Sequence, residues 1–175
     1  MKHLPNLLTI ARIVATPYLF WLTWQRDYTA VIWLFIAIGL TDIADGFLAR
    51  HYHASSRLGA YLDPIADKLL LSGMFVTLLL ARLMEPWLAF LVLGRDLLIL
   101  LAAAGFYLAK RRRDFPPSVW GKTSTFAQIL FICFRVGELN GISVHTAVVG
   151  LEWAVALLIA ISTLDYARRI LASAP

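Results

Sequence analysis

Six long apolar runs follow one another along this chain of 175 residues, and only short polar segments separate them. Hydrophobic residues make up 60% of the sequence and charged residues 15%, a composition that excludes an ordinary soluble domain. About 20 apolar residues in a helix are enough to cross a bilayer. We therefore predict an all-α integral membrane protein with six transmembrane helices in one bundle, at residues 5–24, 28–50, 60–81, 86–108, 121–139 and 146–167.

The spans leave little sequence outside them, so we predict a single membrane domain over residues 1–175. The net charge of +5 would suggest a nucleic-acid partner in a soluble protein, but here its distribution indicates orientation instead. With both termini in the cytoplasm, only Arg26 and Arg82 fall on the opposite side. The cytoplasmic cations would be Lys2, Arg50, Arg57, Lys110, Arg111, Arg112, Arg113, Lys122, Arg168 and Arg169.

Four aspartates lie in two pairs inside the second and third apolar runs: Asp42 with Asp45, and Asp63 with Asp67. A carboxylate at the depth of a bilayer is costly unless it is paired, hydrated or bound to a cation. Residues three or four apart on a helix share a face, so each pair presents both carboxylates in one direction. Because such oxygen ligands suit hard cations, the pattern predicts a site for Mg²⁺ or Mn²⁺, and next for Ca²⁺.

The residues around these aspartates form a longer pattern, Asp42-x2-Asp45-Gly46-x2-Ala49-Arg50-x8-Gly59-x3-Asp63-x3-Asp67. The pattern resembles the signature of the CDP-alcohol phosphatidyltransferases at all eight specified positions. Pro5-Asn6-Leu7-Leu8-Thr9-x2-Arg12 resembles the opening helix of that family. Two later segments resemble its phosphatidylglycerophosphate synthase and cardiolipin synthase branches: Gly94-Arg95-Asp96 and Gly121-Lys122-x-Ser124-Thr125-x2-Gln128.

This resemblance implies an enzyme that transfers a phosphatidyl group from CDP-diacylglycerol to an alcohol and releases CMP. It also implies a homodimer in the cell (inner) membrane, with a cytoplasmic active site and two Mg²⁺ or Mn²⁺ ions. The metal ligands would be Asp42, Asp45, Asp63 and Asp67. Asp67 would in addition act as the general base that accepts the proton of the acceptor hydroxyl.

The resemblance also assigns residues to substrate binding. Gly46 and Gly59 would let a nucleotide approach the backbone, and Arg50 would pair with a phosphate. Asn6, together with Arg12, would face the diphosphate. The residues expected to bind an anionic acceptor are Arg95, Lys122 and Arg169.

Arg95 needs a negatively charged partner because it lies within a span. Asp96 is adjacent in sequence but about 100 degrees round the helix, so we expect a substrate phosphate to be that partner. The alternative is an internal salt bridge to one of three acids, namely Glu138, Glu152 or Asp165.

The acceptor expected for this compact form is glycerol 3-phosphate, with phosphatidylglycerol as the alternative. Phosphatidylglycerophosphate synthases typically have Arg-Glu in the fourth span, followed by Leu-Arg, whereas this chain has Arg95-Asp96 followed by an apolar run. That departure favours a cardiolipin synthase. A cation transporter would also explain clustered carboxylates in a membrane, but not the glycines and Arg50 at this spacing.

Overall fold

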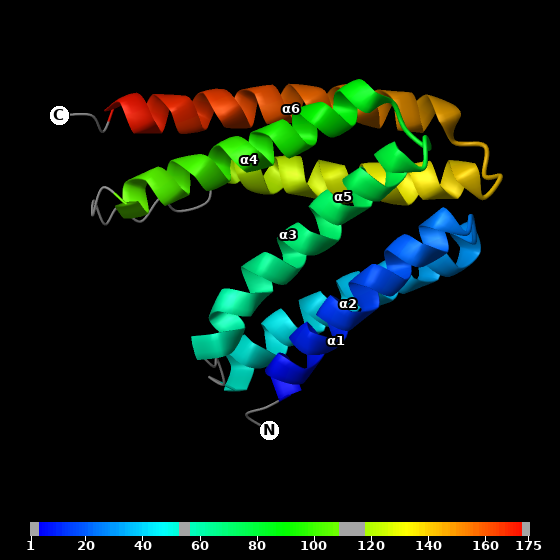
Figure 1. The fold of residues 1–175 in the computed structure, drawn as a ribbon, viewed down its shortest axis with the longest axis horizontal. Helices are drawn as coiled ribbons and strands as arrows, with labels where there is room; N and C mark the ends of the chain where they lie inside the picture. Colours follow the sequence, from blue (N-terminus) through cyan, green and yellow to red (C-terminus); the bar gives the residue numbers. More distant parts are fainter. Residues whose placement is uncertain (1–3, 53–56, 109–117, 173–175) are drawn as a thin grey trace. The chain divides into compact units, whose positions relative to one another are not determined.

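The computed structural model describes the backbone of residues 4–52, 57–108 and 118–172, and the side chains of residues 10–41, 66–101 and 118–168. These residues form an all-α structure, as predicted, with six helices (Figure 1). The predicted starts differ from the observed ones by three residues or fewer. The helices are α1 (Leu4–Trp24), α2 (Tyr28–Tyr52), α3 (Arg57–Leu80), α4 (Pro86–Leu108), α5 (Val119–Leu139) and α6 (His145–Ala172).

One stretch of the described residues, His145–Arg168 in α6, is long and apolar enough to cross a membrane by length and composition. The apolar stretch described in α2 is shorter and covers Tyr28–Thr41. Six membrane crossings therefore stay a prediction, as does the cytoplasmic position of both termini.

The helices group into two compact units. The first unit contains residues 1–81 and 139–141, hence α1, α2 and α3. The second unit contains residues 82–138 and 142–175, hence α4, α5 and α6. A single domain over the whole chain stays a prediction.

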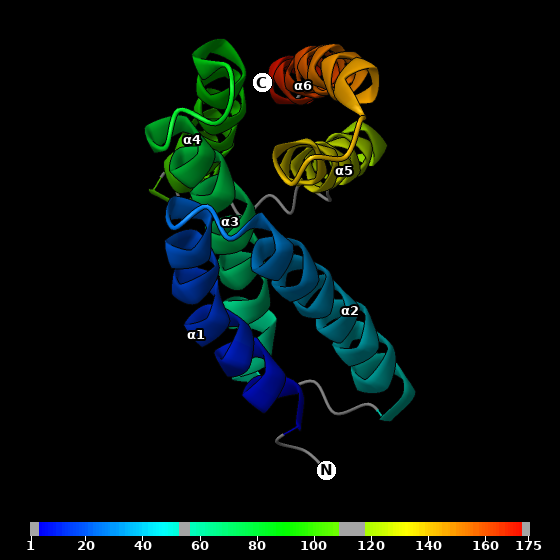
Figure 2. The same cartoon turned by 90° about the vertical axis from the view of Figure 1, so that its right-hand side faces the viewer.

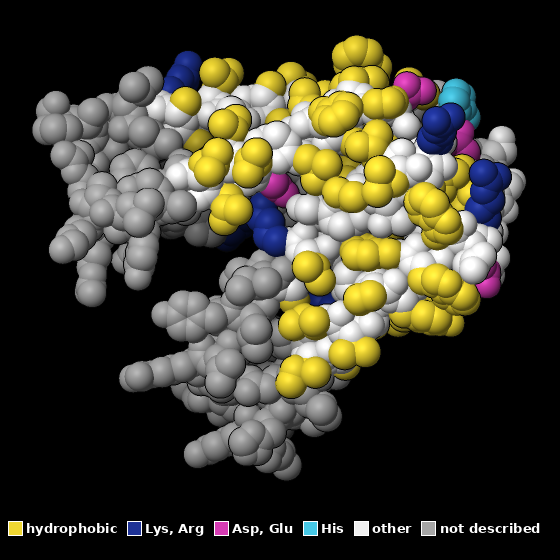
Figure 3. All heavy atoms as spheres, in the orientation of Figure 1, with side chains coloured by type: hydrophobic (Ala, Val, Ile, Leu, Met, Phe, Trp, Pro, Cys, Tyr) yellow, Lys and Arg dark blue, Asp and Glu magenta, His cyan; other side chains and the backbone are white. Residues whose placement is uncertain are grey.

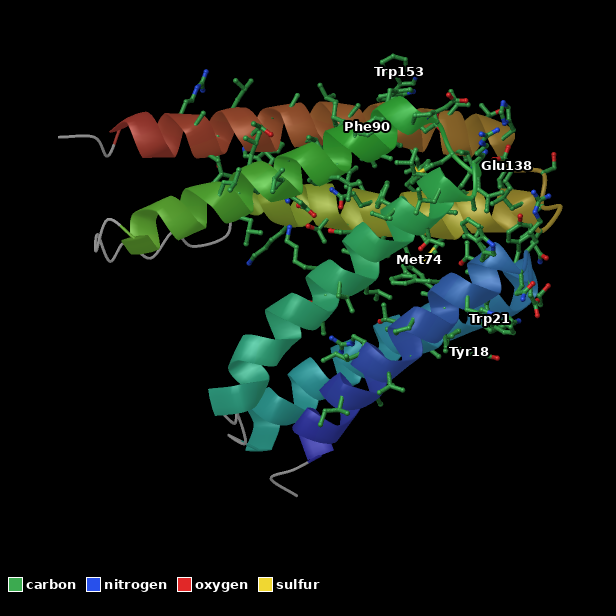
Figure 4. All side chains as sticks on the ribbon, viewed as in Figure 1. Tyr18, Trp21, Met74, Phe90, Glu138 and Trp153 are labelled. Atoms are coloured by element: carbon green, nitrogen blue, oxygen red, sulfur yellow. The ribbon has the colours of Figure 1, made fainter. Side chains whose placement is uncertain are left out.

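In the first unit, α1 packs against both α2 and α3. Figure 2 shows α1 beside α3, and α2 diverging from α1 beyond the turn that joins them. Buried side chains recur on α2 at helical spacing, with Val31, Phe35 and Ile38 on one face. On α3, Met74 and Phe75 are fully buried, and Figure 4 labels Met74. Apolar packing therefore fixes α1 between its two neighbours.

Gly73 lets α1 and α3 approach closely. A Cβ atom built on Gly73 would overlap the ring of Phe20 on α1. In contrast, nothing in the described structure lies within 4 Å of a Cβ built on Gly39 of α2. Gly39 can therefore serve as a control for Gly73, since a side chain has no room at position 73 and free space at position 39.

We expect Gly73→Ala to destabilise the protein by about 1–3 kcal/mol, because the added methyl group displaces the Phe20 ring. Gly39→Ala should be neutral or stabilising by up to about 1 kcal/mol, since alanine favours helix more than glycine does. Thermal unfolding in detergent would measure both effects. Equal melting temperatures for the two variants would contradict the close approach, whereas Phe20→Leu should restore part of the stability that Gly73→Ala removes.

Tight turns join the helices within each unit. Asp27 caps α2, because its Oδ1 accepts a hydrogen bond from the backbone N–H of Ala30 at 3.1 Å. Arg26, which follows α1, has a φ of 62°, and Gly141, which follows α5, has a φ of 90°. Left-handed residues of this kind commonly end helices. Both turns are therefore short and defined by the backbone.

In the second unit, α4 packs against α6. Leu88 and Val92 of α4 are buried, as are Val155 and Ile159 of α6. The outward face of these helices is also apolar, and yellow side chains cover much of it in Figure 3. Trp87 and Trp153 lie on this surface with their ring centroids 5.5 Å apart, while Phe90 is exposed beside them (Figure 4). Such a face fits contact with lipid better than contact with water.

A polar cluster links the segment before α4, the end of α5 and the start of α6. Arg135 on α5 donates one hydrogen bond from Nε to the Leu83 carbonyl at 2.6 Å and another from a terminal nitrogen to Glu138 at 2.6 Å. The other Glu138 oxygen lies 2.6 Å from Nδ1 of His145, where α6 begins. Glu138 is therefore engaged by α5 and α6 rather than serving as the internal partner considered for Arg95.

Candidate active site

The aspartate signature falls on two consecutive helices of the first unit. Its first part, from Asp42 to Arg50, lies on the last turns of α2, and its second part, from Gly59 to Asp67, lies on the first turns of α3. Residues 53–56 connect them, so both parts lie next to the same connection. Most of the predicted site side chains lie outside the described residues, namely Asn6, Asp42, Asp45, Gly46, Arg50, Gly59, Asp63 and Arg169.

Asp67, the predicted general base, is described, and its side chain is 52% exposed. Its Oδ1 accepts a hydrogen bond from Nη1 of Arg12 at 2.9 Å. The Arg12 side chain is 2% exposed, so a buried guanidinium lies behind a half-exposed carboxylate. The family resemblance places Arg12 beside the diphosphate and does not predict this pair, which joins α1 to α3.

The donor chemistry at Asp67 fits a hard cation. An exposed carboxylate offers the oxygen ligand that Mg²⁺ and Mn²⁺ prefer, and Asp63 precedes it by one helical turn. Within the described part of the chain, no three His, Cys, Asp or Glu residues are grouped as a metal site. Because Asp67 is the one predicted ligand with a described side chain, the full set of metal ligands stays a prediction.

Arg95 lies at the centre of a second polar cluster, in the second unit. It is 8% exposed, and its guanidinium donates to Oδ1 of Asp96 at 2.9 Å and to Oγ of Ser162 on α6 at 3.2 Å. The expectation that Asp96 points too far round the helix was therefore wrong, because the long arginine side chain spans the angular offset. Nε of Arg95 is buried and has no hydrogen-bond acceptor among the described residues.

The start of α5 completes this cluster. Ser118 caps the helix, since its Oγ accepts a hydrogen bond from the backbone N–H of Gly121 at 3.0 Å. A Cβ on Gly121 would lie 3.4 Å from Nη2 of Arg95 and 3.8 Å from Oγ of Ser162. Lys122 follows directly and is exposed. One region therefore contains the N-terminus of α5, the backbone of Lys122 and the Arg95 guanidinium. The partial positive charge of the helix N-terminus and the charge of Arg95 would both favour binding of an anion there.

Two further polar side chains of α5 are buried in the same unit. Ser124 and Gln128 follow Gly121 by three and seven residues, and Nε2 of Gln128 lies 3.4 Å from Oγ of Ser124. Both residues belong to the motif that begins at Gly121, but the sequence predicts no role for them, and it predicts none for Ser118 or Ser162. Ser118 could have been found from its place after Pro116-Pro117, since serine is a common helix cap. No local sequence signal marks Ser162.

Comparison with known proteins identifies the family of this chain. Residues 2–165 match the CDP-alcohol phosphatidyltransferase family. The chain belongs to this family. It is therefore a transferase of phospholipid biosynthesis, in a family of membrane enzymes that typically use a divalent metal. Membership also removes the reason to consider a cation transporter.

Individual relatives of the CDP-alcohol phosphatidyltransferase family fall into two groups. The CDP-diacylglycerol–glycerol-3-phosphate 3-phosphatidyltransferase of Aquifex aeolicus is 32% identical, over 94% of this chain and 93% of its own length. A probable phosphatidylglycerophosphate synthase of Mycobacterium tuberculosis is 35% identical, over 98% of this chain and 83% of its own length. The human cardiolipin synthase (CMP-forming) is 35% identical over 78% of this chain, which spans 43% of that relative.

Proposed function

We propose that this phosphatidyltransferase moves the phosphatidyl group of CDP-diacylglycerol to the hydroxyl of glycerol 3-phosphate and releases CMP. The observation that carries an anionic acceptor is the buried Nε of Arg95, which has no hydrogen-bond acceptor among the described residues. A buried donor left unsatisfied costs about 1–3 kcal/mol, so a ligand oxygen at this position would be favourable. Full-length similarity to the Aquifex enzyme, whose name specifies glycerol 3-phosphate, supports that compound as the acceptor.

In the proposed reaction, Asp67 accepts the proton of the acceptor hydroxyl while that oxygen bonds to the lipid-side phosphorus. The bond from this phosphorus to the bridging oxygen breaks, and CMP leaves with that oxygen. Asp42, Asp45, Asp63 and Asp67 would hold divalent metal, which supplies charge neutralisation at the diphosphate when it is bound.

The remaining site residues position the two substrates. Asn6, Gly46, Arg50 and Gly59 would bind the CDP-lipid. Arg95, Lys122 and Arg169 would bind the phosphate of the acceptor. With six membrane spans and cytoplasmic termini, both ends of the signature would face the cytoplasm, where nucleotide-activated lipid and glycerol 3-phosphate meet. A homodimer in the cell (inner) membrane belongs to the same proposal.

Phosphatidylglycerol is the second candidate acceptor, and the sequence after Asp96 favours it. The apolar run that follows lacks the Leu-Arg pair typical of phosphatidylglycerophosphate synthases. Relatives named cardiolipin synthase match 65% to 78% of this chain. Their acceptor would place a phosphodiester, rather than a phosphomonoester, against Arg95.

CMP release by the purified protein tests the proposed function. We expect release from CDP-diacylglycerol with Mg²⁺ and glycerol 3-phosphate, and its complete loss when EDTA removes the metal. Phosphatidylglycerol, inositol phosphate and serine serve as parallel acceptors. Release with phosphatidylglycerol alone would make the enzyme a cardiolipin synthase, and no release from folded protein with any acceptor would contradict phosphatidyl transfer.

A further inference from the structure

The pair between Arg12 and Asp67 has an unusual distribution of exposure. The Arg12 side chain is 2% exposed and the Asp67 side chain 52%, while Nη1 and Oδ1 lie 2.9 Å apart. The guanidinium therefore contacts the carboxylate from the protein interior. The remaining surface of the carboxylate faces outward, where a substrate can reach it.

The position of Arg12 is itself fixed by the packing of α1. Arg12, Thr16 and Leu19 are all buried, at the spacing of one helical face. Oγ of Thr16 donates a hydrogen bond to the Arg12 carbonyl at 2.8 Å. One turn further along, Phe20 packs against Gly73 of α3. The helix that carries Arg12 is thus positioned against α3 by the contact between Phe20 and Gly73.

A general base must hold its carboxylate within hydrogen-bond reach of the hydroxyl that it deprotonates. A half-exposed aspartate without support can rotate about its side-chain bonds, and a displacement of about 1 Å can cost about a hundredfold in rate. The directed Nη1–H donor of Arg12 restricts that rotation. A lysine could supply the charge but not the same planar geometry.

We propose that Arg12 is a positioning residue, which holds the Asp67 carboxylate in its reactive orientation from the interior of the first unit. This proposal rests on the role of Asp67 in the proposed function. The competing role for Arg12 is direct binding of the CDP-lipid diphosphate. Its burial argues against that role, because a diphosphate would have to reach a guanidinium that is 2% exposed.

Steady-state kinetics of Arg12→Gln separate the two roles. We expect kcat to fall about 10-fold to 100-fold, the effect of a misplaced catalytic group. The KM for CDP-diacylglycerol, and its dissociation constant measured by equilibrium binding with Mg²⁺, should change less than about threefold because the lipid does not touch Arg12. Arg12→Lys should recover part of kcat. The control is Arg26→Gln, since Arg26 is an exposed arginine in the turn that follows α1.

A raised dissociation constant for CDP-diacylglycerol with unchanged kcat would overturn the proposal and make Arg12 a lipid ligand. The double variant Arg12→Gln, Asp67→Asn gives a second criterion. If Arg12 acts through Asp67, the double variant should turn over as slowly as Asp67→Asn alone. The proposal would also be overturned if Arg12→Gln lowered kcat by the same factor in the Asp67→Asn background as in the wild-type background.

Melting temperatures in detergent of the wild-type protein, Arg12→Gln, Asp67→Ala and the double variant Arg12→Gln, Asp67→Ala distinguish this proposal from the proposed function, because alanine, unlike asparagine, cannot accept the hydrogen bond of Arg12. If Arg12 and Asp67 interact directly, the fall in melting temperature of the double variant should be smaller than the sum of the falls of the two single variants. Additive losses would overturn the positioning role whether or not the enzyme is active. Absence of CMP release by the wild-type protein would instead contradict the proposed function, while coupled losses would still support the Arg12–Asp67 pair.

Discussion

Replacing Asp67 with asparagine should reduce phosphatidyl transfer by about a hundredfold to ten-thousandfold, the usual contribution of a general base. Asparagine has the same shape and can accept the hydrogen bond of Arg12 through its amide oxygen, so the contact between α1 and α3 should remain. The substitution removes the capacity to take a proton, while Asp42, Asp45 and Asp63 would still hold the metal. Metal-dependent binding of CDP-diacylglycerol should therefore stay close to that of the wild-type protein, as measured by equilibrium binding alongside CMP release.

Asp27→Asn is the matched control for this substitution. Asp27 is an exposed aspartate of the same unit, and asparagine caps helices as well as aspartate does. Its turnover and melting temperature should match those of the wild-type protein. If Asp67→Asn lost lipid binding together with turnover, Asp67 would be chiefly a metal ligand.

Replacing Arg95 with leucine should affect both stability and acceptor binding. Removal of one member of a buried ion pair costs about 3–5 kcal/mol, because the remaining charge loses its countercharge. The Ser162 contact, which connects α4 to α6, would also be lost. If Arg95 binds the acceptor phosphate, the KM for glycerol 3-phosphate should rise about 10-fold to 100-fold, as expected for a charge-assisted hydrogen bond.

The double variant Arg95→Leu, Asp96→Asn separates these two effects. Neutralising Asp96 should restore part of the melting temperature, since a buried pair can be replaced by uncharged groups at little cost. The KM for the acceptor should stay high. Recovery of a wild-type KM would show that Arg95 serves an internal pair only. Arg135→Leu is the control, because it breaks an ion pair of the same unit and should lower stability without changing the acceptor KM.

Local signals in the sequence were sufficient to predict the helices. The length of the apolar runs predicted how many helices there are, and the predicted start of the fourth helix at residue 86 is where α4 begins, at Pro86. The cap of α5 by Ser118 was not predicted. The aspartate signature was predicted to lie on consecutive helices, as it does. These features depend on residues close together in the chain, which is why one sequence is enough to find them.

Pairings between distant residues could not be predicted in the same way. Arg12 and Asp67 are 55 positions apart, and nothing near Arg12 indicates which carboxylate it meets. For Arg95 the error was geometric, since the angle between adjacent positions on a helix describes Cβ directions and not the reach of a guanidinium. Ser162, which is 67 positions from Arg95, becomes recognisable only when α4 and α6 are packed.

The contact between Phe20 and Gly73 constrains how the sequence of this enzyme can evolve. A larger residue at position 73 is compatible with the same helix spacing only if position 20 carries a smaller one. Related sequences that keep this arrangement should therefore vary at the two positions together, with an aromatic residue opposite glycine or a short side chain opposite a longer one. Drift at either position alone would move the helix that carries Arg12, and selection for turnover would act against it.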